Sequence, residues 1–297
     1  MSRPLENTTD KSCLPPDPHP VTPRISLPRD ACDAHCHVFG PAAKFPYAAG
    51  RSYTPPDAPV ENLRALHAQL GISRAVIVHA SCHGSEMDVT LDAISASDGR
   101  YRGVAVVADS VSDIELARLH AGGIRGIRFN FVKHLGGVPD LAVFHRLLAR
   151  IKPLGWHVVL HFDAGDLLEQ RELLARIDVP FIIDHMGRVK AADGLEQKPF
   201  QSLLALYRTN PLAWIKISGA ERVSVGNRPF RDAVPFAQAL LAVDASRLLW
   251  GTDWPHPNIT RDMPNDGELV DLLGEMCPDE ALRTRILVDN PTRMYWS

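Results

Sequence analysis

The sequence predicts a (β/α)8 barrel of the TIM type. Eight short apolar runs alternate with segments in which apolar residues recur at helical spacing. The runs are continuously apolar, which is typical of strands buried on both faces of a parallel sheet. Eight such units in about 250 residues match the size of a closed barrel. An open, doubly wound sheet is the second possibility, but no Gly-x-Gly-x-x-Gly motif follows the first strand.

The expected elements follow one another from residue 31 to residue 288. The predicted strands cover residues 31–38, 74–80, 103–108, 124–130, 157–163, 180–185, 214–219 and 248–253. The predicted helices cover residues 60–70, 113–121, 141–151, 167–177, 200–207, 230–241 and 279–288. In the segment 141–151, five apolar side chains recur three or four residues apart, so they form one buried face.

Residues 1–29 are expected to form an extended arm in front of a single catalytic domain, residues 30–297. Seven prolines in this stretch exclude a regular helix or strand. The arm also lacks the apolar core of about 7–15 residues that a secretory signal requires.

Composition limits the class of protein. Of the 297 residues, 45% are hydrophobic and 23% charged, and the formal net charge is −3. There is neither a basic stripe for nucleic acid nor an apolar run long enough to span a bilayer. The five cysteines lack Cys-x-x-Cys spacing, so we expect a protein of the reducing cytoplasm. The sequence leaves open whether the chain forms a homo-oligomer.

Polar side chains collect at the ends of the predicted strands. His35 and His37 end the first strand and point to the same face. Alone, such a pair is more often two polar residues on a half-exposed strand than a functional site. Later strand ends add, in chain order, His79, Ser81, His83, Arg128, Asn130, His161, His185, Arg188, Ser218, Arg222 and Asp253. Because the carboxyl ends of barrel strands carry the active site, we expect these side chains to form one.

The pattern of histidines and one aspartate on strands one, five, six and eight resembles the amidohydrolase superfamily of metal-dependent hydrolases. Within it, the chain closely resembles the 2-pyrone-4,6-dicarboxylate lactonases. The motifs that carry the resemblance are Asp33-Ala34-His35-Cys36-His37-Val38-Phe39-Gly40-Pro41, Ala80-Ser81-Cys82-His83-Gly84, Gly126-Ile127-Arg128-Phe129-Asn130-Phe131, Ile183-Asp184-His185-Met186-Gly187-Arg188, Trp250-Gly251-Thr252-Asp253-Trp254-Pro255-His256-Pro257-Asn258 and Asn290-Pro291. They extend over essentially all of the chain after the arm.

The resemblance implies hydrolysis of a small, anionic, unsaturated lactone in bacterial breakdown of aromatic compounds. It implies that His35, His37 and His185 polarise the lactone carbonyl and that Asp253 is the general base. The residues that it places around the substrate are Arg128, Arg188, Arg222, Tyr53, Ser81, His83 and His134. Arginine suits planar carboxylates because its guanidinium binds them through two parallel hydrogen bonds.

Two positions depart from the dicarboxylate lactonases. His161 stands where they have a tyrosine, and His134 stands where they have an arginine. Those lactonases work without a metal, whereas His161 restores the superfamily's ligand. The residues His35, His37, His161 and Asp253 are therefore expected to bind Zn²⁺. The loss of an arginine favours a substrate of the 4-sulfomuconolactone type, whose hydrolases are related and contain zinc.

Three alternatives stay open at this point. The chain could be a metal-independent 2-pyrone-4,6-dicarboxylate lactonase. It could be a metal-dependent decarboxylase of a neighbouring amidohydrolase branch, which would use the same ligands. It could also be a binding protein on a barrel scaffold, although such a protein has no need for Asp253 beside a candidate metal site.

Overall fold

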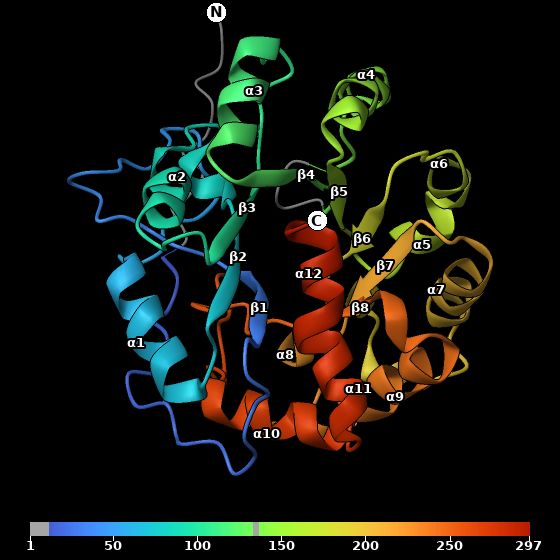
Figure 1. The fold of residues 1–297 in the computed structure, drawn as a ribbon. Helices are drawn as coiled ribbons and strands as arrows, with labels where there is room; N and C mark the ends of the chain where they lie inside the picture. Colours follow the sequence, from blue (N-terminus) through green and yellow to red (C-terminus); the bar gives the residue numbers. More distant parts are fainter. Residues whose placement is uncertain (1–11, 133–136) are drawn as a thin grey trace, which may run out of the picture.

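Eight parallel strands follow one another around a nearly closed barrel in the computed structural model, which describes residues 12–132 and 137–297 (Figure 1). The strands are β1 (Cys32–Cys36), β2 (Arg74–Val78), β3 (Tyr101–Ala105), β4 (Ile124–Asn130), β5 (His157–His161), β6 (Phe181–Ile183), β7 (Ala213–Lys216) and β8 (Leu248–Leu249). Each strand pairs with the next in sequence. The predicted (β/α)8 barrel is confirmed, and the sequential strand order excludes the doubly wound sheet.

Helices lie outside the barrel between the strands (Figure 1). They are α1 (Val60–Leu70), α2 (Asp88–Ser95), α3 (Asp113–Ala121), α4 (Leu141–Ile151), α5 (Asp166–Glu169), α6 (Arg171–Ala175), α7 (Lys198–Thr209), α8 (Ala220–Val223), α9 (Val234–Val243), α10 (Asp266–Met276), α11 (Glu280–Thr284) and α12 (Asn290–Tyr295). The helices expected at 60–70, 113–121 and 141–151 have the predicted bounds. The segment expected at 167–177 is instead divided into α5 and α6, and the sequence analysis did not predict α2 or α10.

Most strands end earlier than predicted. The ladder of β8 stops at Leu249, and that of β6 stops at Ile183. Directly after β6, the backbone turns into the left-handed region at His185, with φ of 51°. After β6 and β8 the chain therefore leaves the sheet where the polar side chains begin, so His185 and Asp253 stand on loops at the carboxyl ends of these strands.

Three main-chain hydrogen bonds join the β8 side of the barrel to the β1 side. They run from Ala34 N to Trp250 O (2.9 Å), from Asp253 N to His35 O (2.8 Å) and from His37 N to Trp254 O (2.8 Å). Among the described residues, β8 and β1 form no paired ladder. The contact nevertheless places Asp253 directly beside the two histidines of the first strand.

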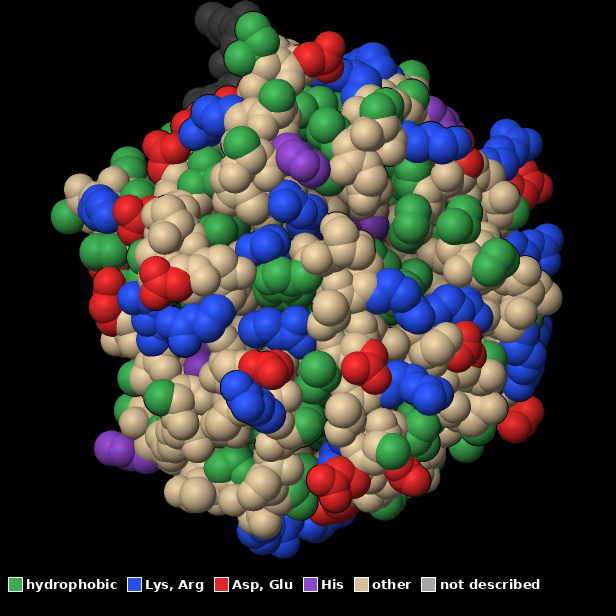
Figure 2. All heavy atoms as spheres, viewed as in Figure 1, with side chains coloured by type: hydrophobic (Ala, Val, Ile, Leu, Met, Phe, Trp, Pro, Cys, Tyr) green, Lys and Arg blue, Asp and Glu red, His purple; other side chains and the backbone are tan. Residues whose placement is uncertain are grey.

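Helix α12 covers the amino end of the barrel and crosses in front of it in Figure 1. Its Tyr295 packs with inward-facing side chains of the strands, among them Cys32, Val76, Val104, Val159 and Ile182. Figure 2 shows this face, with Lys and Arg side chains spread across it. The guanidinium groups of Arg74 and Arg102 lie 4.8 and 5.2 Å from the ring centroid of Trp296. The carboxyl ends of the strands lie on the opposite side of the barrel, and the candidate site is there.

Residues 12–30 form the N-terminal arm, which contains no helix or strand beyond an isolated bridge between Ser12 and Thr54. The arm approaches β1 past α1 and α10 (Figure 1). In the described part of the chain, no helix combines the length and the apolar character needed to cross a bilayer.

Candidate active site

A polar pocket opens at the carboxyl ends of the strands. It encloses about 520 Å³, including the space at its mouth. Its lining residues are His37, Tyr53, Ser81, Arg128, His161, His185, Arg188, Arg222, Asp253, Pro257 and Asn258. Nine of the residues singled out from the sequence are therefore gathered in one place.

Two of the described residues to which the resemblance assigns a role, His35 and His83, do not line this pocket. His35 is fully buried beneath it, with its ring centroid 4.6 Å from that of His185. His83 lies outside the lining, and its Nδ1 is 3.3 Å from the carbonyl oxygen of Pro46. Residues 81–83 form a short 3₁₀ helix, so the alternation of an extended strand does not apply to them. His134 falls outside the described residues.

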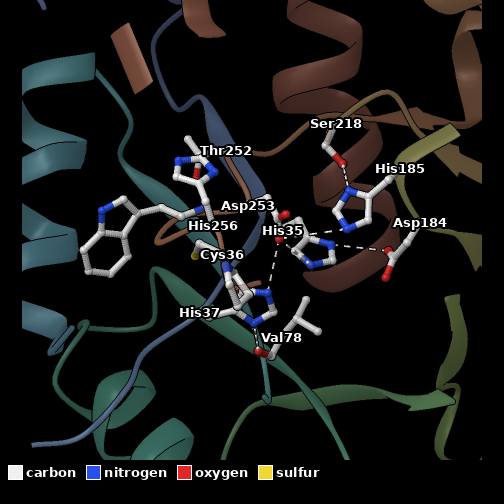
Figure 3. A network of polar contacts seen from close by, with 12 residues as sticks. His35, Cys36, His37, Val78, Asp184, His185, Ser218, Thr252, Asp253 and His256 are labelled. Atoms are coloured by element: carbon white, nitrogen blue, oxygen red, sulfur yellow. Dashed lines mark hydrogen bonds and ion pairs between the residues drawn. The ribbon is translucent and has the colours of Figure 1, made fainter. Parts of the chain in front are cut away.

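Asp253 stands at the centre of three imidazoles (Figure 3). Its Oδ1 lies 3.2 Å from Nε2 of His37, 3.5 Å from Nε2 of His35 and 3.9 Å from Nε2 of His185. Nδ1 of His37 is 2.7 Å from the carbonyl oxygen of Val78 and must donate to it. In a neutral His37 ring, Nε2 and Oδ1 then face each other as two acceptors, an arrangement that requires a proton or a cation between them.

Arg222 binds the other oxygen of Asp253. Its Nε and Nη2 lie 2.7 and 2.5 Å from Oδ2. Burial alone would raise the pKa of Asp253, but the guanidinium of Arg222, together with the neighbouring imidazoles, holds that pKa well below its usual range. The carboxylate is therefore ionised, with Oδ1 left to face the pocket.

The backbone around Asp253 is held by Asp33 and by a close approach at Gly251. Asp33 Oδ1 accepts from the main-chain nitrogens of His35 (3.0 Å) and Thr252 (3.1 Å), while its Oδ2 accepts from Thr252 Oγ1 (2.6 Å). A Cβ atom at position 251 would lie 2.4 Å from the main-chain nitrogen of His35. Only glycine permits this approach, which brings Asp253 to the first strand.

His185 and Arg188 reach the pocket through a run of left-handed backbone. His185, Met186, Gly187 and Arg188 have φ values of 51°, 53°, 66° and 49°. Nδ1 of His185 lies 3.1 Å from Ser218 Oγ, which fixes the ring plane. Four successive positive φ values are costly, so the surrounding structure must stabilise this turn.

His161 is a neutral imidazole with both nitrogens in contact. Its Nδ1 lies 3.1 Å from Oδ1 of Asn130, and its Nε2 lies 3.2 Å from Nη1 of Arg188. The amide oxygen accepts, so Nδ1 carries the proton and Nε2 accepts from the guanidinium. Burial, with a contribution from Arg128, lowers the pKa of His161 well below its ordinary value.

Sequence reasoning missed a buried ion pair beneath the pocket. Lys216 and Asp184 are both fully buried, with Lys216 Nζ 3.1 Å from Asp184 Oδ1 and 2.9 Å from His35 Nδ1. Nη2 of Arg128 lies 3.0 Å from Asp184 Oδ2. A lysine inside the apolar run Trp214-Ile215-Lys216-Ile217 was the available signal, because a buried lysine requires a partner. Asn258, also in the lining, was seen only as part of a motif.

Three of the four proposed metal ligands converge. His35, His37 and Asp253 offer donor atoms that all lie within 4.8 Å of one another, and all three residues are buried. Nε2 of His35 is a buried atom without a hydrogen-bond partner. These residues fit a zinc ion in type and spacing. Among the described residues, His161 is not part of a group of this kind with them.

Comparison with known proteins identifies the family of the chain. The family model described as amidohydrolase matches residues 32–296. A 2-pyrone-4,6-dicarboxylate hydrolase of Comamonas testosteroni is 43% identical over 286 residues, 94% of each chain. A 4-sulfomuconolactone hydrolase of Rhizobium radiobacter is 44% identical over 274 residues, 91% of each chain. A crystal structure from Acinetobacter baumannii, described as a probable 2-pyrone-4,6-dicarboxylic acid hydrolase with citric acid bound, superimposes with a TM-score of 0.79 at 27% identity, over 90% of this chain and 100% of that one.

Proposed function

This chain belongs to the amidohydrolase family, and from that premise we propose that it hydrolyses a small, anionic, unsaturated lactone formed in the breakdown of aromatic compounds. The observation that carries the proposal is Asp253, an ionised carboxylate within 3.2–3.9 Å of three imidazoles. Three arginines, Arg128, Arg188 and Arg222, line the same pocket. A base, a set of groups for an oxyanion and an anion-binding wall are what lactone hydrolysis requires.

The reaction begins with a water beside Asp253. Oδ1, which Arg222 leaves free, accepts a proton from this water, and the water oxygen bonds to the lactone carbonyl carbon. The resulting oxyanion lies near His185 and His37, which stabilise its charge. When the ring C–O bond breaks, Asp253 returns its proton to the departing ring oxygen. The product is an open-chain hydroxy acid or its keto form.

The pocket walls account for an anionic substrate. Arg188 faces the pocket from the turn after β6 and Arg222 from α8, and Tyr53 and Ser81 lie on the same lining. Arg128 also lines it, although one of its nitrogens binds Asp184. The lactone would therefore present anionic groups to Arg188 and Arg222, with Arg128 completing the positive wall. The relative that holds citric acid has a similar fold, and its ligand is an anion of this kind.

A zinc ion is part of the first candidate function. His35, His37 and Asp253 would hold it, and when bound it would polarise the carbonyl and lower the pKa of the attacking water. Two facing acceptors, His37 Nε2 and Asp253 Oδ1, support a cation between them. His161 is the proposed fourth ligand, because Asn130 fixes its proton on Nδ1 and leaves the lone pair on Nε2. To bind the ion, Nε2 would exchange its hydrogen bond from Arg188 for the metal.

A metal-independent lactonase is the second candidate, and one contact favours it. The ammonium of Lys216 can only donate, and it lies 2.9 Å from Nδ1 of His35. Asp184 Oδ1, which can only accept, lies 3.3 Å from the same nitrogen. If Lys216 is the partner of Nδ1, the His35 proton is on Nε2, which would then donate to the substrate carbonyl rather than bind zinc. The two candidates therefore differ in the role of His35.

The test measures zinc content and hydrolysis of 4-sulfomuconolactone and 2-pyrone-4,6-dicarboxylate, before and after chelation. We expect about one zinc per chain, loss of activity on chelation and recovery when zinc is returned. The variant His161→Tyr is expected to lose bound zinc, and unchanged zinc content would remove His161 from the ligand set. Full activity of metal-free protein selects the second candidate. Failure of the native chain to open either lactone contradicts the proposed function.

A further inference from the structure

The N-terminal arm is tied to the start of α10 by one buried side chain, Asn265. Oδ1 of Asn265 accepts from Val21 N (2.9 Å), and Nδ2 donates to Asp17 Oδ2 (2.9 Å) and to His19 O (3.0 Å). Asn265 occupies the N-cap position of α10, but its side chain caps no nitrogen of the helix. Its side-chain hydrogen bonds are thus directed to the arm rather than to α10.

Two glycines make room for the arm on α10. A Cβ atom at Gly267 would lie 1.9 Å from the carbonyl oxygen of Val21, and one at Gly274 would lie 3.0 Å from Cδ1 of Ile25. The glycines are seven residues apart, so they share one face of the helix. Glycine costs about 1 kcal/mol relative to alanine inside a helix, and here it permits close docking of the arm's main chain.

Charged side chains fasten the arm at two further points. Arg24 donates from its main-chain nitrogen and from Nε to Asp271 of α10, both at 2.7 Å. Asp17 lies 3.4 Å from Nη1 of Arg228. Exposed pairs contribute little stability individually. Together with Asn265 they fix the course of the arm from Asp17 to Arg24.

Beyond these anchors, the first described residues of the arm lie at the rim of the pocket. Cys13 N donates to the carbonyl oxygen of Thr54 (3.0 Å), next in sequence to Tyr53. The main-chain nitrogen of Asn258 lies 3.4 Å from Cys13 Sγ, whose thiol in turn lies 3.8 Å from Oδ1 of Asn258. Tyr53 and Asn258 both line the pocket. The arm therefore contacts two loops of the pocket wall that are about two hundred residues apart in sequence.

We propose that the N-terminal arm is a positioning element of the substrate pocket: docked on α10, it holds the loops of Tyr53 and Asn258 together through Cys13. The inference rests on the proposed function only where it concerns lactone affinity. The imidazoles stand at the ends of β1 and β6, and no described residue of the arm contacts them or Asp253 directly; Asn258 lies on the loop that follows Asp253. The arm thus determines how tightly the substrate binds, while the rate of the chemical step depends on the barrel.

The test compares Asn265→Ala and Gly267→Ala with the native full-length chain. Both changes release the arm, and alanine at 267 would otherwise favour the helix. We expect trypsin to cleave after Arg24 faster, amide hydrogens near Thr54 and Asn258 to exchange faster, and KM for the lactone to rise roughly tenfold with little change in kcat. Gly274→Ala is the milder comparison and should release the arm less, since its Cβ meets the Ile25 side chain, 3.0 Å from Cδ1 and 3.3 Å from Cγ2, and no main-chain atom of the arm.

Cys13→Ala tests the contact at the rim with the arm still docked. We expect a smaller rise in KM, unchanged cleavage after Arg24, and partial recovery in Cys13→Ser. Unchanged amide exchange near Thr54 and Asn258 after release of the arm would overturn the proposal, and so would a fall in kcat with constant KM. If the native chain opens no lactone, the proposed function fails, while the exchange measurement still decides whether the arm supports the two loops.

Discussion

Arg222 and Asp253 are joined through a single carboxylate oxygen. Two nitrogens of the guanidinium lie 2.7 and 2.5 Å from Oδ2, whereas Oδ1 faces the imidazoles. The two oxygens thus have different tasks: one is bound to a permanent positive charge, and the other is free to take a proton. This arrangement determines the pKa of the carboxylate, and it determines which oxygen, Oδ1, accepts the proton.

Asp253→Asn is expected to lower kcat by about a thousandfold or more, because an amide cannot accept the proton of water. Steady-state kinetics and a thermal unfolding curve measure activity and fold together, and we expect the melting temperature to stay near the native value. Asp178→Asn, which alters a surface pair with Lys152 away from the pocket, is the control and should leave kcat unchanged. An active Asp253→Asn protein would remove Asp253 from the role of base.

Arg188→Met is expected to raise KM by roughly ten- to a hundredfold, the cost of removing one charged hydrogen-bonding group from an anion. Arg188→Lys should recover only part of the loss, because an ammonium does not bind a planar anion through two parallel bonds. Arg150→Ala, which breaks a surface pair with Asp113, is the control and should leave KM unchanged. Equal kinetics of the native and Arg188→Met proteins would show that Arg188 does not hold the substrate.

Thr252→Val is expected to reduce both stability and turnover. Thr252 Oγ1 donates to the buried Asp33 Oδ2 at 2.6 Å and accepts from Trp254 N at 3.0 Å. Losing these bonds should cost about 2–3 kcal/mol of the free energy of unfolding, measured by urea denaturation. The next residue is Asp253, so kcat should fall as well. Thr252→Ser keeps the hydroxyl and should behave like the native chain. Equal losses of stability and turnover in Thr252→Ser and Thr252→Val would show that the hydroxyl does not stabilise the site.

Acid should destabilise the fold through histidines that are buried as neutral rings. Burial lowers the pKa of His79 and of His157 from 6.5 to about 3. Below pH 6.5 the unfolded chain binds protons that the folded chain does not, so stability falls as pH falls, by up to about 1.4 kcal/mol per pH unit for each such ring.

The measurement is the free energy of unfolding in urea between about pH 5 and about pH 7. His157→Gln, which cannot take up a proton, should show a shallower dependence on pH than the native chain. An unchanged slope would mean that His157 is not held neutral by the fold.

The starting points of the strands and three helices could be predicted because hydrophobic period and length decide them locally. Strand ends were less predictable: β8 ends at Leu249, and by Asp253 the backbone is left-handed, with φ of 65°. The break between α5 and α6 depends on packing against the sheet, which no local pattern contains.

The gathering of most site residues followed from one rule, that barrel strands present their carboxyl ends to the site. The rule was wrong for His83, which does not line the pocket, because residues 81–83 form a 3₁₀ helix instead of continuing the strand. The Lys216–Asp184 pair could not be predicted either, since its partners meet only inside the closed barrel. The ligand role of His161 remains a prediction.

The contact between β8 and β1 should open locally at a lower free energy than that of global unfolding. Seven strand pairs are held by ladders, whereas this one depends on three main-chain bonds and the Asp33 contacts. A brief local separation there would part Asp253 from His35 and His37 with the other seven pairs intact. Mild heat or denaturant should then abolish activity reversibly while the secondary structure persists. The temperature range in which the enzyme is active would be set by this local separation rather than by the global free energy of unfolding.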